Sequence, residues 1–132
     1  MQKPLLMSIA EIGGYPNFTP LYQQAGFEVL VENRMRKAMS TIRKRTPQVI
    51  VAEFNFQSDF RDRTSSLESM MSVVERLPDT RVIVFYEKEY AHQFARLLAI
   101  HEFHQTFTFP IPEHELAACV AALNLSLIHI SE

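Results

Sequence analysis

Short apolar runs alternate with amphipathic stretches along the chain, and this alternation constrains the fold more than any other feature of the sequence. Three of the runs are nearly continuous in apolar or β-branched residues, which is typical of strands buried on both faces of a parallel sheet. The predicted strands cover residues 5–10, 28–31, 49–54, 82–86 and 106–109.

The stretches between these runs repeat apolar residues at helical spacing. Leu67, Met70, Met71 and Val74 fall at i, i+3, i+4 and i+7, and similar spacing predicts helices around residues 35–42, 90–98 and 116–123. Strands that alternate with helices predict an α/β fold, in which a parallel sheet carries helices on both faces through right-handed crossovers. Ligands of such sheets bind at the carboxyl ends of the strands.

The first helix is atypical, because its segment contains two prolines. One possibility is a short helix capped by Thr19, with Pro20 in its first position. The other is a helix that begins near Pro16 and kinks at Pro20. At the other end of the chain, Pro112 suits the first turn of the last helix.

The composition narrows the class of protein. A chain of 132 residues, 47% of them apolar, suggests one domain with a normal core. Its net charge of −2 gives no overall attraction to nucleic acid or to an anionic membrane. No apolar run could span a bilayer, the N-terminus lacks a signal-peptide pattern, and the single cysteine, Cys119, has no internal disulfide partner. Together these features favour a cytoplasmic protein.

The final segment, LSLIHISE (125–132), does not continue the helical pattern cleanly. It resembles translated vector or adapter sequence, so we assign residues 1–124 to the domain and base no functional argument on 125–132. On this interpretation the natural chain is longer, and residues 1–124 are the N-terminal domain of a larger regulator.

Several segments, taken in order, resemble those of response-regulator receiver domains. The segments are LLMS (5–8), AGFEVLV (25–31), TPQVIVAEF (46–54), RVIVFY (81–86) and FPI (109–111). No single motif is specific, and the resemblance rests on their order and spacing over about residues 3–123. It implies a flavodoxin-like, doubly wound sheet of five parallel strands in the order 2-1-3-4-5, with about five helices.

The resemblance also implies where a phosphorylation site would lie. Receiver domains phosphorylate an aspartate that ends the third strand, next to two acidic residues that follow the first strand and help to bind Mg²⁺. A serine or threonine after the fourth strand and a lysine after the fifth contact the phosphoryl group. In this chain the acidic pair falls at Ile9 and Ala10, the phosphoacceptor at Glu53, the hydroxyl residue at Tyr86 and the lysine at Phe109.

These residues lack most of the chemistry that phosphoryl transfer needs. Mg²⁺ requires oxygen ligands, but Ile9 and Ala10 offer none from their side chains and Glu11 comes one position late. The charge that develops on the phosphoryl group requires a cation, but Phe109 stands at the lysine position. In addition, Thr106 replaces the family's switch aromatic residue. We therefore expect a degenerate pseudo-receiver that is not an enzyme, uses no metal or cofactor, and works by protein–protein contact in bacterial signal transduction or transcription control. Two alternatives stay open: a sensor whose ligand binds in the crevice near Glu53, or a receiver that is still phosphorylated. A polar, open crevice would favour the sensor, and one filled by Tyr86 and Phe109 would favour the interaction module.

The resemblance places the working surface on the fourth helix, fifth strand and fifth helix. We expect Arg96, Thr106 and Phe107 to belong to this face. A homodimer, or a complex with a protein partner or output domain, would form through it. Direct nucleic-acid binding is not expected, because no DNA-reading motif is recognisable. Membrane contact is not expected either, because no apolar run could span a bilayer and the net charge gives no attraction to its surface.

Four further features have both an ordinary and a functional interpretation. Glu53 is either a permanent mimic of phosphorylation or an ordinary polar residue at a strand end. The basic segment 34–45 is either a solvated face or a docking patch for an acidic partner or a nucleotide phosphate. The histidines of HEFH (101–104) fit a surface pair better than a metal site. The polar loop 55–68 either covers the crevice or only connects a strand to a helix.

Overall fold

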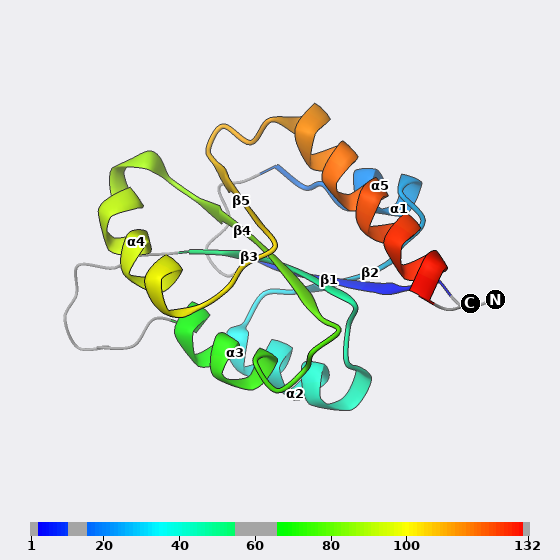
Figure 1. Cartoon of the computed structure of the whole chain (residues 1–132), viewed down its shortest axis with the longest axis horizontal. Helices are drawn as coiled ribbons and strands as arrows, with labels where there is room; N and C mark the ends of the chain where they lie inside the picture. The colour runs from blue at the N-terminus through cyan, green and yellow to red at the C-terminus, as the bar shows by residue number, and fades with distance from the viewer. Residues whose placement is uncertain (1–2, 11–15, 55–65, 131–132) are drawn as a thin grey trace.

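The computed structural model describes residues 3–10, 16–54 and 66–130, which form a five-stranded parallel sheet with helices on both faces (Figure 1). The strand order is β2-β1-β3-β4-β5, which confirms the expected flavodoxin-like, doubly wound fold. The strands are β1 (Leu5–Ile9), β2 (Glu28–Glu32), β3 (Val49–Glu53), β4 (Arg81–Tyr86) and β5 (Gln105–Thr108).

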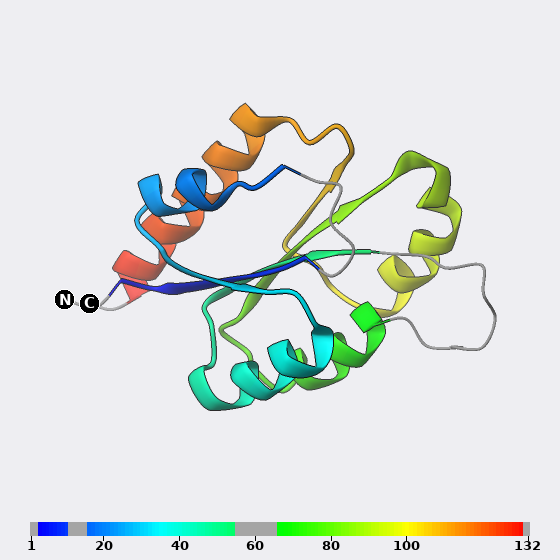
Figure 2. The same ribbon diagram turned by 180° about the vertical axis from the view of Figure 1, so that it is seen from behind.

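The helices form two layers, seen above and below the sheet in Figures 1 and 2. Helices α1 and α5 pack on one face, while α2, α3 and α4 pack on the other. None of the helices in the described part of the chain is both long and apolar enough to cross a membrane. Their bounds are α1 (Thr19–Gln24), α2 (Met35–Arg45), α3 (Ser66–Val74), α4 (Ala91–Ile100) and α5 (Glu113–Ile130), with a short 3₁₀ turn, η1 (Lys88–Tyr90), before α4.

The central strand β3 contributes to both layers of the core. Val49 and Val51 pack with α1 and α5, whereas Ile50 and Ala52 pack with the helices of the other face. All four side chains are at most 2% exposed. A strand buried on both faces needs an apolar residue at every position, which explains why this run is continuous in the sequence.

Two helix starts differ from the prediction. Helix α1 has Phe18, not Thr19, as its N-terminal cap. The alternative prediction, a helix that begins near Pro16 and kinks at Pro20, is wrong. The amide of Thr19 donates to Asn17 Oδ1 at 3.1 Å, an Asx-type turn that directs the chain into the helix at Thr19, one residue earlier than a Thr19 cap predicts. Likewise Pro112 precedes α5 instead of lying inside it, and its carbonyl accepts a hydrogen bond from the amide of Leu116.

Helix α5 continues to Ile130, so it includes most of the segment 125–132, in which the helical spacing of apolar residues is not clean. Leu116, Val120 and Leu123 bury its inner face, while Leu125 is 62% exposed. A helical backbone satisfies its own hydrogen bonds, so the helix can extend past its last buried side chain. The origin of residues 125–132 stays a prediction.

Candidate functional site

A small cavity lies at the carboxyl ends of the central strands, where doubly wound folds place their ligands. Its volume is about 160 Å³, and its walls come from all of the first four strands and from the segment that leads into α1. The residues that matter for its chemistry are Ile9, Ala10, Phe18, Tyr22, Glu53 and Phe85.

Glu53 is the carboxylate of this cavity. It ends β3, where its register partner on β4 is Phe85, and it is 8% exposed. Side chains alternate along a strand, so Glu53 lies on the same face of the sheet as Val51, toward α1 and α5. The structure therefore has Glu53 at the end of the third strand, as the sequence predicted.

The end of β1 contributes Ser8, Ile9 and Ala10 to the cavity. Ile9 is 2% exposed and belongs to the core, and Ala10 donates its amide to the carbonyl of Glu32 at 3.0 Å. Both residues line the cavity, and neither side chain carries an oxygen. Glu11 lies outside the described residues. Among the residues that are described, no cluster of histidine, cysteine and acidic side chains could hold a metal ion.

Tyr86 and Phe109 do not line the cavity, so the structure does not show the filled crevice that would favour an interaction module. Tyr86 follows Phe85 and therefore faces the opposite side of the sheet, where its ring lies 4.6 Å from that of Phe94. Phe109 is 43% exposed and does not line the cavity. The same alternation that aims Glu53 into the cavity aims Tyr86 away from it.

Three aromatic residues that were not predicted from the sequence line the cavity instead: Phe18, Tyr22 and Phe85. Phe18 meets Phe85 edge-on, with ring centroids 5.9 Å apart and planes at 77°. Tyr22 meets Phe18 at 6.4 Å, and burial raises the pKa of the Tyr22 phenol, which therefore stays neutral. The available signal was the aromatic residue at position 18, next to the proline-rich start of α1. Its partner on β4 could not be predicted without the register of the strands.

The residues expected on the interaction face lie in different environments. Arg96 is exposed on α4, and Thr106 is half-buried on β5. Phe107 is only 7% exposed, because it packs edge-on against Phe85 at 6.3 Å, so its side chain belongs to the core and not to the face. The face itself stays a prediction.

The two histidines of the HEFH segment have separate surroundings. His101 Nδ1 lies 3.2 Å from Glu75 Oε2. His104, just before β5, instead donates its backbone amide to the carbonyl of Val82 in β4. The predicted covering loop lies mostly outside the described residues, which exclude 55–65.

No family model and no curated protein matches the sequence. Solved structures match nearly the whole chain. A response-regulator receiver domain from Clostridium thermocellum is 12% identical, with a TM-score of 0.74 over 96% of this chain and 98% of that one. The receiver domain of AraT, a response regulator from Geobacillus stearothermophilus, is 13% identical, with a TM-score of 0.72 over 99% of this chain and 100% of that one. A DNA-binding response regulator of the LuxR family from Staphylococcus aureus is 18% identical, with a TM-score of 0.69 over 92% and 98% of the two chains. The chain therefore has the fold of the receiver domains of two-component response regulators.

Proposed function

We propose that this chain is a phosphorylation-independent pseudo-receiver that regulates bacterial signalling or transcription in the cytoplasm by binding another protein. The observation that carries the proposal is the aliphatic cavity wall formed by Ile9 and Ala10 beside Glu53. A receiver needs oxygen ligands at this point to bind Mg²⁺. With Phe109 in place of the lysine, no side chain at that position neutralises charge on a transferring phosphoryl group.

The packing of α4 supports a working surface held in one state. Phe94 of α4 contacts Tyr86 at 4.6 Å, Phe54 at 5.1 Å and Phe103 at 5.6 Å, measured between ring centroids. Each such aromatic pair contributes about 0.5–1.5 kcal/mol beyond its buried area. Helix α4 is therefore held against β4 by side-chain packing, without need of a phosphoryl group.

The partner surface in this proposal is the face of α4, β5 and α5. Arg96 is exposed there, and two large apolar side chains, Leu98 at 49% and Phe109 at 43%, are exposed on α4 and after β5. Partly apolar, partly charged surfaces of this kind suit a protein partner, an output domain or a second copy of the chain.

A ligand-sensing role is the second candidate, and the cavity beside Glu53 favours it. At about 160 Å³ the cavity is smaller than the 300–1,000 Å³ typical of ligand pockets, so only a very small molecule would fit. Most of the wall is apolar, so such a ligand would itself be largely apolar.

The decisive experiment is incubation of the full chain with acetyl phosphate and Mg²⁺, followed by intact mass measurement. We expect no added phosphoryl group, while an active receiver domain treated in parallel should gain one. A near-stoichiometric mass increase that Glu53→Gln abolishes would overturn the proposal and establish a still-phosphorylated receiver.

A further inference from the structure

In the described part of the chain β2 pairs with β1 alone, so it forms an outer edge of the sheet. The amide of Glu28 donates to the carbonyl of Pro4 at 2.9 Å, and the carbonyl of Glu32 accepts from Ala10 at 3.0 Å, so both ends of β2 face β1. Backbone groups alternate in direction along a strand of a parallel sheet. The intervening Val29 and Val31 therefore direct their N–H and C=O groups away from the sheet.

The side chains of this edge also alternate between its two faces. Val29 packs against the core of α1 and α5, and Val31 on the same face is 47% exposed. Leu30 packs on the opposite face, beneath α2. A strand added at this edge would therefore meet an exposed valine on one face and helix α2 on the other.

One flank of α2 runs along β2 and carries cations. Thr41 Oγ1 donates to Glu32 Oε2 at 3.3 Å, and Arg45 pairs with Glu28 at 2.9 Å, so the flank meets both ends of the strand. Residues three, four and seven positions apart share a helix flank. The cations of this flank, which we call the β2 stripe, are Arg34, Lys37, Lys44 and Arg45.

The four cations of the β2 stripe outnumber the two carboxylates that β2 directs toward them, Glu28 and Glu32. No acidic residue lies between Glu32 and Glu53 in the sequence. Within the described part of the chain, Arg45 is the one member of the stripe that forms an ion pair, and all four members are exposed. The surface is thus locally basic although the whole chain carries a net charge of −2.

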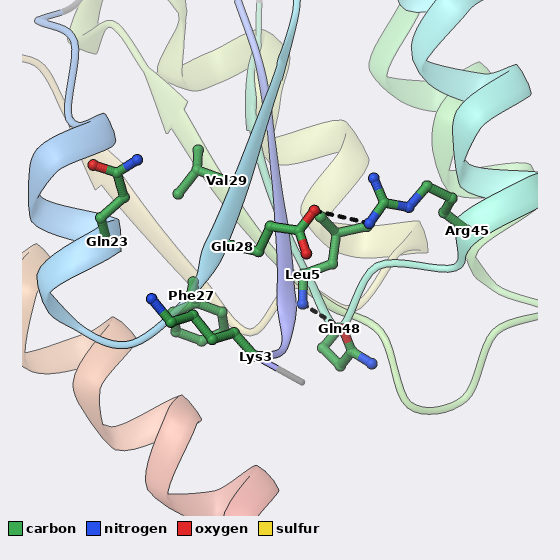
Figure 3. A pocket seen from close by; sticks show the side chains of 8 residues that line it. All are labelled: Lys3, Leu5, Gln23, Phe27, Glu28, Val29, Arg45 and Gln48. Atoms are coloured by element: carbon green, nitrogen blue, oxygen red, sulfur yellow. Dashed lines mark hydrogen bonds and ion pairs between the residues drawn. The ribbon is translucent and has the colours of Figure 1, made fainter. Parts of the chain in front are cut away.

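An open groove extends the basic surface around the start of β2. Its volume is about 760 Å³, and its polar groups come from two cations, Lys3 and Arg45, from the carboxylate of Glu28 and from the amides of Gln23 and Gln48. Figure 3 shows Arg45 and Gln48 on one side of the strand and Gln23 on the other. The groove therefore leaves the amino end of the edge accessible from both faces of the sheet.

We propose that the β2 edge binds an extended, acidic segment of a partner protein, which adds to the sheet as an outer strand. Its backbone pairs with Val29 and Val31. Acidic side chains at alternate positions face the β2 stripe, and the apolar side chains between them cover Val31. This surface is separate from the face of α4, β5 and α5 discussed above.

A second copy of the chain is a poorer occupant of this edge. Edge-to-edge pairing of two β2 strands would bring two β2 stripes together, and like charges across paired strands are destabilising. The same cations that attract an acidic segment therefore oppose self-association.

The proposal can be tested with the full chain and a labelled soluble peptide in which glutamate and valine alternate. Fluorescence anisotropy at low ionic strength should show saturable binding that weakens as salt is added. A peptide in which lysine replaces glutamate should not bind. No binding of the glutamate peptide would overturn the proposal and leave the stripe as protection against aggregation.

Matched charge reversals on α2 locate the binding surface. Lys37→Glu combined with Lys44→Glu should weaken binding about tenfold, because two attractive contacts become repulsive. Arg36→Glu combined with Arg43→Glu makes the same change in charge on the opposite flank and should weaken it less than about threefold. Equal losses in the two double variants would show only a diffuse electrostatic attraction and overturn the proposal.

N-methylation of the peptide tests strand addition without altering the protein. Methyl groups on the alternate amides that face β2 should abolish binding, while methyl groups on the other set should be tolerated. Binding that is indifferent to both patterns would contradict strand pairing. A self-association of the chain that the peptide displaces would assign the edge to a second copy instead.

Discussion

Replacing Gly26 with alanine should destabilise the domain through two effects that can be measured separately. Gly26 joins α1 to β2 with φ of +98°, a backbone conformation that side-chain-bearing residues rarely adopt. A Cβ at this position would also collide with Nδ2 of Asn124 in α5. That amide donates to the carbonyl of Ala25 at 2.6 Å and ties α5 to this corner of the sheet.

The size of the effect follows from these two contributions. A left-handed backbone costs a residue with a Cβ about 1–2 kcal/mol. Loss of the Asn124 hydrogen bond adds about 0.5–1.5 kcal/mol. The sum of about 1.5–3.5 kcal/mol is a large part of the 5–15 kcal/mol by which domains are usually stable.

Urea unfolding of the two single variants and the double variant separates the contributions. Asn124→Ala alone should cost about 0.5–1.5 kcal/mol. In that background Gly26→Ala should cost only about 1–2 kcal/mol, because no side-chain amide remains to displace. Full additivity of the two changes would refute the inferred contact between Gly26 and Asn124. A Gly26→Ala cost below about 0.5 kcal/mol would refute the strained backbone as well.

Three further outcomes are expected. Millimolar Mg²⁺ should leave the melting temperature unchanged, since the end of β1 offers aliphatic side chains; a saturable rise that Glu53→Gln removes would contradict this. Arg96→Glu should weaken any self-association seen by sedimentation, whereas Glu53→Ala should not; the reverse pattern would show that the cavity controls the surface. Partial burial, and then the Arg81 guanidinium, lower the pKa of the His104 imidazole from its usual 6.5. The unfolded chain therefore binds this proton more tightly, so stability should fall as the pH drops below 6.5 through the folded-state pKa, and urea midpoints of His104→Gln should show a shallower fall.

The strands, their alternation with helices and the class of fold could all be predicted from the amino-acid sequence. The reason is local: burial on both faces of β3 demands an apolar residue at every position from Val49 to Ala52, and an amphipathic helix demands its own spacing. Three residues of the cavity could be predicted for the same local reason. Ile9, Ala10 and Glu53 occupy strand ends that can be counted along the chain, and all three line the cavity.

The contacts between side chains inside that cavity could not be predicted from the sequence, because they depend on how distant segments pack. The resemblance places Tyr86 at the phosphoacceptor pocket, but its ring packs on Phe94, because Tyr86 and Phe85 point to opposite faces of β4. Phe18 reaches Phe85 from a segment far away in the chain, so no local pattern could pair them. Periodicity along the chain fixes the face on which a side chain lies, whereas its contacts depend on strand order and register, which form only when distant segments pack together.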